Sequence, residues 1–194
     1  MDDFKHDISF FKTIPWCRAL IDDPNYAFTV TFARQPKANQ EDELLARTLK
    51  TGSTIPALVS YYQKPTSPTA PIEELRTLVS IGPGVNGWQD MLHGGIAATL
   101  LDELMGVLLH LNNELLKERA ISAGKIHDHS NTVTAELTIK YLKPISTPQT
   151  MLIRVWLVKM EGRKGWVDGA IEDAHGNAMV KGSGFFLQLR PSKV

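Results

Sequence analysis

The sequence predicts an α+β domain in which a curved antiparallel sheet wraps around one long central helix. The helix should open at His93-Gly94-Gly95 and run through a strongly apolar stretch to about Lys117. A helix that is apolar nearly all round must be buried on most sides, and in a chain of 194 residues a curled sheet can surround it. Four later segments rich in Val, Ile, Thr and aromatic residues supply strands: 132–142, 150–160, 165–172 and 178–189.

Short connections indicate that these later strands form an antiparallel meander. Residues 161–165 and 173–177 contain Gly and Asn, which adopt positive φ at little steric cost, so both segments are expected to be hairpin turns. A further strand, 74–81, precedes the helix and is separated from it by a loop, 82–90. The predicted order is therefore strand, long helix, antiparallel meander.

The first seventy or so residues give a mixed pattern. Pro65, Pro68 and Pro71 mark a stiff connector, because proline fixes φ and removes a backbone donor. We therefore divide the chain into an N-terminal extension, 1–71, and a main domain, 72–194. The extension could cap a pocket, add strands or mediate assembly. Its expected elements are a helix at 8–21 broken by Pro15, a strand at 27–33 and helical stretches at 41–50 and 57–63.

Composition excludes several classes of protein. Acidic and basic residues balance at 21 each, which argues against a nucleic-acid partner or an anionic membrane surface. Cys17 is the one cysteine and the N-terminus lacks a signal-like apolar core, so a cytoplasmic location is expected. The longest apolar segment, Ile96 to Leu111, contains Asp102 and Glu103 and is too short to span a bilayer.

One stretch combines His93-Gly94-Gly95 with an aspartate nine positions after the histidine, at 102, and a later strand ends in Tyr141-Leu-Lys-Pro144. This combination closely resembles the hot-dog thioesterase superfamily, in particular the acyl-CoA thioesterase branch that includes phenylacetyl-CoA thioesterases and the mammalian thioesterase-superfamily members. The resemblance covers roughly 74–189, and the extension resembles that of fungal homologues. It implies a hot-dog fold and hydrolysis of an acyl-CoA to CoA and a carboxylic acid, without metal or redox cofactor.

The helix start has the chemistry of an oxyanion site. The two glycines let another molecule approach the free N–H groups closely, and the helix dipole favours negative charge there. A thioester carbonyl polarised by the N–H of Gly94 or Gly95 would be stabilised most in the tetrahedral transition state. His93 is expected to orient this site rather than to shuttle protons, because a histidine at a helix N-terminus is pushed toward its neutral form.

Asp102 is the candidate catalytic carboxylate. It lies in an apolar stretch where an unpaired carboxylate is costly, so it must be paired, exposed at an interface or retained for chemistry. The resemblance implies chemistry, either as a general base on water, which we favour, or as a nucleophile that forms a transient anhydride. Glu103 is the alternative, because a related thioesterase class uses a glutamate on this helix.

The spacing of these residues predicts an assembly. At ~1.5 Å rise per residue, Asp102 lies roughly 13 Å along the helix from His93, too far to reach a carbonyl held at its own helix start. The sequence therefore predicts a homodimer with shared active sites, in which Asp102 of one chain faces the helix start of the other, or a dimer of such dimers, a homotetramer.

Four further residues are candidates with weaker support. Thr134 matches the Ser or Thr that supports the catalytic water in the mammalian-type members, but it is also an ordinary strand residue. Those members place an Asn six residues before the His; here Gly87 stands there and Asn86 is one residue further away. Arg163 and Lys164, in a hairpin turn, could meet CoA phosphates or be simply solvated.

Other functional readings are weaker. Gly82-Pro-Gly84-Val-Asn-Gly87 follows a strand but lacks the immediate helix and the βαβ repeats of a dinucleotide site. His127-Asp-His129 lies in a polar loop without further metal-ligand spacing, and the chain contains no G-x-S-x-G elbow. Two alternatives remain open: a hot-dog enoyl-thioester hydratase or dehydratase, and a non-catalytic acyl-thioester-binding protein.

Overall fold

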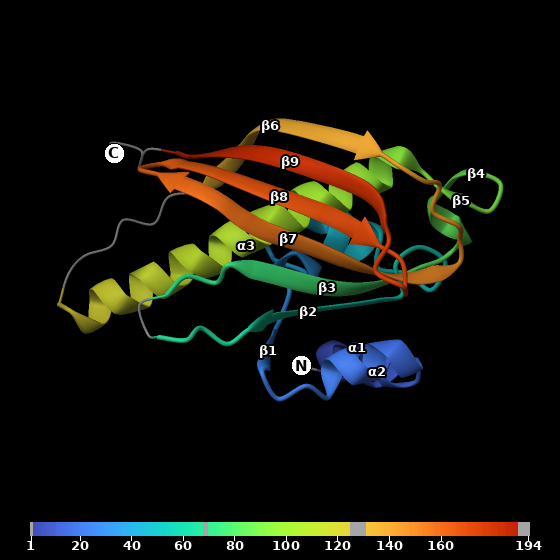
Figure 1. Cartoon of the computed structure of the whole chain (residues 1–194), viewed down its shortest axis with the longest axis horizontal. Helices are drawn as coiled ribbons and strands as arrows, with labels where there is room; N and C mark the ends of the chain where they lie inside the picture. The colour runs from blue at the N-terminus through green and yellow to red at the C-terminus, as the bar shows by residue number, and fades with distance from the viewer. Residues whose placement is uncertain (1, 68–69, 125–130, 190–194) are drawn as a thin grey trace.

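The computed structural model describes residues 2–67, 70–124 and 131–189 and contains one seven-stranded antiparallel sheet with a long helix across one face (Figure 1). The strands are β1 Tyr26–Thr29, β2 Ala57–Gln63, β3 Glu74–Ile81, β6 Thr132–Tyr141, β7 Gln149–Glu161, β8 Lys164–Glu172 and β9 Ala178–Gln188. The strand order is β1-β2-β3-β7-β8-β9-β6. The predicted arrangement of one long helix wrapped by a curved sheet is confirmed. The predicted four-strand meander is correct only for β7, β8 and β9, because β6 pairs with β9 and β3 takes the place beside β7.

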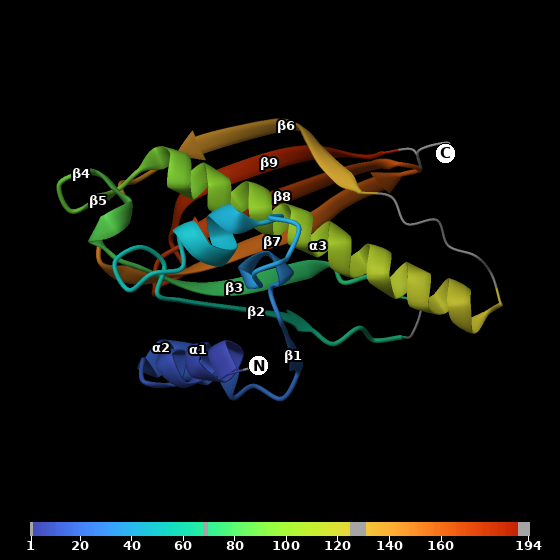
Figure 2. The same cartoon turned by 180° about the vertical axis from the view of Figure 1, so that it is seen from behind.

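The central helix, α3 (Gly94–Ser122), is buried along its first half. Leu100, Leu101, Leu104 and Met105 are at most 1% exposed and pack against the concave face of the sheet. Towards its end the helix extends past the sheet, and Ile121 is 62% exposed (Figure 2). The burial on most sides predicted from the apolar sequence therefore holds for the first half only.

The helix is also longer than its apolar segment suggested. It has 29 residues, and among the described residues it is the one helix that could cross a membrane by length and composition alone. In this fold it is the core helix of the sheet, with its buried leucines facing β3, β7, β8 and β9.

The N-terminal extension adds two strands to the sheet at its β3 edge. β2 pairs with β3 and β1 pairs with β2, so the sheet is continuous across the proline connector. The helices α1 (Asp2–Lys12) and α2 (Pro15–Ile21) pack on the outer face of β2 and β3, where Phe11, Cys17 and Ile21 contact Val59 and Tyr61. The predicted break at Pro15 is where α2 begins.

The prediction of a helical stretch at 57–63 was wrong, because this segment is strand β2. β2 is buried on both faces: Val59 and Tyr61 lie under α1 and α2, while Leu58 and Tyr62 face the α3 side. A strand covered on both faces is a continuous apolar run, and such a run does not show the alternation that identifies a strand.

The other predictions for the extension need smaller corrections. The strand expected at 27–33 is β1 followed by a 3₁₀ turn, η1 (Phe32–Arg34), and the helical stretch expected at 41–50 is a five-residue π-helical turn, η2 (Leu44–Thr48). Both turns lie over α3 (Figure 2).

Between β3 and α3 are a 3₁₀ turn, η3 (Pro83–Val85), and a small hairpin of β4 (Asn86–Trp88) and β5 (Met91–Leu92).

Candidate active site

His93 caps the first turn of α3. Its Nδ1 accepts a hydrogen bond from the Gly95 N–H at 2.9 Å, and its carbonyl oxygen accepts from the N–H groups of Ile96 and Ala97. His93 is thus the N-cap residue of α3 and satisfies one of the free N–H groups of its first turn. Within the described part of the chain, the Gly94 N–H has no acceptor. Of the two predicted oxyanion donors, Gly94 is therefore the one that can serve a substrate without displacing His93.

The Tyr-x-x-Pro motif packs directly against this helix start. Tyr141 Oη donates to the Gly94 carbonyl at 2.8 Å, and a Cβ added to Gly94 would come within 3.2 Å of that hydroxyl. Both residues line a cavity of about 360 Å³. The other lining residues are mainly apolar: Met91, Leu92, Ala97, Leu142, Lys143, Pro144, Ile145 and Val180.

Gly87 and Asn86 support the helix start from behind. A Cβ on Gly87 would lie 2.8 Å from both Cα and Cδ2 of His93, so a larger residue at position 87 would displace the histidine. Asn86 Oδ1 accepts a hydrogen bond from the Thr147 hydroxyl, and Asn86 lines neither this cavity nor the one at Asp102. The structure therefore gives Asn86 a contact with the segment between β6 and β7 rather than a place on the cavity wall.

Asp102 and Thr134 meet across the space between α3 and β6. Thr134 Oγ1 donates to Asp102 Oδ1 at 2.7 Å, and Thr134 lies where the pairing of β6 with β9 shifts register. Both side chains line a cavity of about 690 Å³. Two of the predicted site residues, 32 positions apart, are thus brought into direct contact.

Glu103 lines the same cavity. Burial, followed by the nearby carboxylates of Asp42 and Asp102, raises its pKa to about 7. Near neutral pH this side chain is therefore protonated in a large fraction of molecules and can donate a hydrogen bond. Asp102 differs from it by holding the Thr134 hydroxyl.

Several other cavity residues were not identified from the sequence. Phe32, Lys37, Glu41 and Asp42 come from the extension, and no spacing in the sequence links them to α3. His110 and Asn113 did carry a signal: with 102, 103 and 106 they follow one another at helical spacing, which makes a polar stripe on an otherwise apolar helix. The cavity is completed by Gly106, Asn131, Thr132, Val133 and Phe186.

Arg163 and Lys164 lie at the β7–β8 turn, at the end of the sheet opposite the start of α3 (Figure 1). Arg163 Nη1 donates to the Gln188 carbonyl at 3.0 Å, which fixes its head group to β9. Its small crevice shares Thr132 and Phe186 with the Asp102 cavity, so Arg163 is adjacent to that cavity and distant from the helix start.

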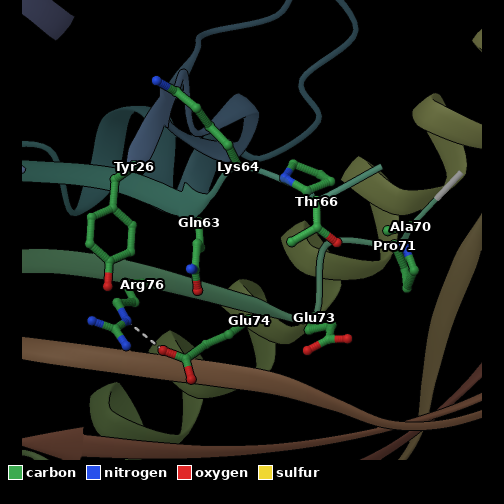
Figure 3. A pocket seen from close by; sticks show the side chains of 10 residues that line it. Tyr26, Gln63, Lys64, Thr66, Ala70, Pro71, Glu73, Glu74 and Arg76 are labelled. Carbon is green, nitrogen blue, oxygen red and sulfur yellow. Dashed lines mark hydrogen bonds and ion pairs between the residues drawn. The ribbon is translucent and has the colours of Figure 1, made fainter. Parts of the chain in front are cut away.

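A further cavity, about 230 Å³, lies beside the proline connector between Tyr26 and Glu73 (Figure 3). Two of its charged side chains are already paired, because Glu74 accepts from Arg76 and also from Arg154, which lies outside the cavity. It shares no residue with the cavities at Gly94 or Asp102.

Metal-ligating groups do not cluster in the described residues: no set of three or more His, Cys, Asp or Glu is placed to hold an ion there. The sequence His127-Asp-His129 lies outside the described residues.

Comparison with known proteins gives a consistent picture. Residues 89–180 match the family model described as the thioesterase superfamily. Verlamelin biosynthesis protein B of Lecanicillium sp is 33% identical over 137 residues, which cover 61% of this chain and 59% of that protein. Acyl-coenzyme A thioesterase THEM4 of Xenopus laevis is 26% identical over 87% of this chain and 67% of its own length. The chain thus spans about three fifths to two thirds of these relatives.

A solved structure described as a thioesterase superfamily protein is similar in fold. Its TM-score is 0.50 at 25% sequence identity, and the match covers 68% of this chain and 56% of that one.

Proposed function

Because residues 89–180 match the thioesterase-superfamily model, we propose that this chain is an acyl-CoA thioesterase that hydrolyses an acyl-CoA to CoA and a carboxylic acid. The observation that carries the proposal is the contact between Asp102 and Thr134 in the wall of a large cavity. The name of the THEM4 relative supports a CoA thioester as the substrate.

The Gly94 N–H is the proposed oxyanion donor. It sits in the first turn of a 29-residue helix, where unpaired amides and the helix dipole favour negative charge. As water attacks the thioester carbon, the carbonyl oxygen gains charge, and a fixed donor there stabilises the transition state more than the ground state. The Tyr141 contact to the Gly94 carbonyl holds this turn in place.

Asp102 is the proposed general base. Thr134 occupies Oδ1, so Oδ2 remains to accept a proton from water. The water oxygen bonds to the carbonyl carbon, the C–S bond breaks, and the proton held by Asp102 passes to the CoA thiolate. A nucleophilic route would instead join Asp102 to the acyl carbon as an anhydride, which water then hydrolyses. Both routes need water and no other co-reactant.

Two chains are proposed to build each site. Gly94 and Asp102 are separated by roughly 12 Å along one helix, so a carbonyl held at Gly94 cannot be reached by Asp102 of the same chain. Strand β6 ends the sheet with one edge unpaired in the described chain, and it carries Thr134 together with Val133 and Tyr141, which are 41% and 55% exposed. A twofold pairing along this edge would bring Thr134 and Asp102 of one chain towards the helix start of the other.

The experiment that tests the function measures free-thiol release from short, long and aromatic acyl-CoAs with the purified protein. We expect turnover on at least one of them, and Asp102→Asn should lower kcat by ~10²-fold or more with little change in substrate binding. Asp168→Asn is the matched control, because Asp168 lies on β8 and lines none of the described cavities around the site. Binding of an acyl-CoA without any thiol release would instead identify a binding protein.

A further inference from the structure

The cavity at Asp102 has a second wall that comes from outside the thioesterase-superfamily match. Resting on the proposed function, we infer that this wall, formed by Phe32, Lys37, Glu41 and Asp42 opposite Glu103 and His110, determines specificity by favouring acyl groups with a neutral hydrogen-bonding substituent, such as a hydroxyl, remote from the thioester. We call these four residues of the extension the polar wall.

The polar wall is anchored to the core rather than laid loosely over the cavity. Arg34 is only 4% exposed, and its guanidinium donates to the carbonyl oxygens of Leu45 and Ile55, at 3.3 and 3.0 Å. Lys50 Nζ donates to the Arg34 carbonyl at 3.2 Å and pairs with Asp3. A segment tied at both ends to buried groups can hold side chains at fixed positions in a binding site.

The backbone of the polar wall is locally strained. Among the described residues other than glycine, three have positive φ, and two of them are Gln40 and Asp42, at 64° and 58°. Left-handed conformations are uncommon outside glycine and persist where the surrounding structure imposes them. Here the conformation brings the Asp42 carboxylate to Lys37 Nζ, which also lies 5.1 Å from the Phe32 ring centroid and 3.5 Å from Glu41.

The charges of the cavity exclude an anionic ligand group. Glu41, Asp42, Asp102 and Glu103 contribute carboxyl groups against the single ammonium of Lys37, so a CoA phosphate would be repelled. A plain hydrocarbon chain is also a poor ligand, because it would remove the Lys37–Asp42 pair from water without replacing its hydrogen bonds.

A neutral donor and acceptor fits the cavity better. A hydroxyl can donate to a carboxylate oxygen and accept from Lys37 or from a protonated Glu103. The polar stripe of α3 continues from Asp102 to His110, roughly 12 Å along the helix, so the substituent would lie several bonds from the thioester carbon.

The test compares kcat/KM for decanoyl-CoA with that for hydroxydecanoyl-CoAs whose hydroxyl is at the middle or the end of the chain. The native protein should prefer a hydroxylated substrate, and Lys37→Met with Asp42→Asn should reduce that preference by about tenfold, as expected for losing a hydrogen bond. Asn tolerates the left-handed backbone of position 42. The control, Lys12→Met with Asp22→Asn, removes an ion pair of the same kind at the α1–α2 surface and should leave the preference unchanged.

Three results would overturn the inference: a native preference for decanoyl-CoA, an unchanged ratio in the double variant, or an equal rise in KM for every substrate, which would assign the polar wall to the pantetheine arm. If no thioester is hydrolysed, the proposed function fails but the inference is still tested. Calorimetric binding of decanoyl-CoA and the hydroxydecanoyl-CoAs, which are then stable ligands, should show the same preference in the native protein and its loss in the double variant, and equal binding would refute it.

Discussion

Thr134 Oγ1 donates a hydrogen bond to Asp102 Oδ1 at 2.7 Å, so the edge strand β6 directly orients a carboxylate of the central helix. Removing this hydroxyl should misplace the proposed base without removing it. We expect Thr134→Val to lower kcat by about tenfold with little change in KM, because one hydrogen bond that fixes the base is lost. Steady-state kinetics on the best acyl-CoA measures both parameters.

Thr134→Ser is the matched variant, since it keeps the hydroxyl and removes only a methyl group. It should retain most of the native kcat. If Val and Ser reduce kcat equally, the hydrogen bond to Asp102 has no part in turnover.

Glu103 should make the stability of the protein depend on pH. Its pKa of about 7 in the folded chain is raised from 4.5, so the folded state binds more protons than the unfolded state between these values. Stability is therefore highest below pH 4.5 with respect to this group and falls as the pH rises through 7. Glu103→Gln should stabilise the protein at pH 8 by at most about 3 kcal/mol, and by much less at pH 5.

Urea unfolding at the two pH values measures this difference. Glu118→Gln, an exposed position on the same helix, is the control and should give the same small effect at both. A Glu103→Gln effect that does not depend on pH would show that Glu103 titrates normally in the folded protein.

The proposed sharing of the active site between two chains predicts complementation. Asp102→Asn should inactivate one half of a site, and Gly94→Val should inactivate the other half because its side chain would meet Tyr141. When the two inactive variants are unfolded together and refolded, mixed dimers should contain one intact site each. Thiol release should therefore reappear at roughly a quarter of the native rate per chain, as random mixing implies.

Each variant refolded alone is the control and should stay inactive while keeping the native assembly size in size-exclusion chromatography. Persistent inactivity of the mixture, with mixed dimers demonstrated by differently tagged chains, would place both halves of the site within one chain.

Gly87 should be a sensitive position although it lies in a loop. A Cβ there would come 2.8 Å from His93, so Gly87→Ala should shift the N-cap of α3, lower thermal stability and reduce kcat. The free energy of unfolding should fall by about 1 kcal/mol or more, the typical effect of losing a helix N-cap. Gly52→Ala is the control, because nothing lies within 4 Å of a Cβ there. Equal melting temperatures for both variants would contradict the proposed crowding at His93.

The sequence predicted the fold best where one face of an element is buried or where a helix is apolar throughout. β7, β8 and β9 were located to within a few residues, because their strands alternate and their turns contain glycine. β2 was misassigned because α1 and α2 cover its second face, a contact between segments that no local pattern reports.

The candidate site was predicted only in part, because some of its residues come together through contacts that no local sequence pattern reports. Asp102 and Thr134 were identified through a family resemblance, and the structure adds that they touch. The capping of the Gly95 N–H by His93 depends on a side-chain rotamer, which sequence does not specify. Lys37 and Asp42 reach the cavity only because the chain folds back over α3, so their roles could not be deduced from spacing.

The two edges of the sheet differ in length. β6 presents ten residues at one edge, whereas β1 presents four at the other and is followed at once by a 3₁₀ turn. A long free edge strand can pair with the edge strand of another molecule, and repeated pairing of this kind builds fibres. Short or interrupted edge strands resist it. A chain with only one long edge can join a single neighbour through it, after which both long edges are used. We therefore expect the short strand contributed by the extension to disfavour polymerisation through that edge.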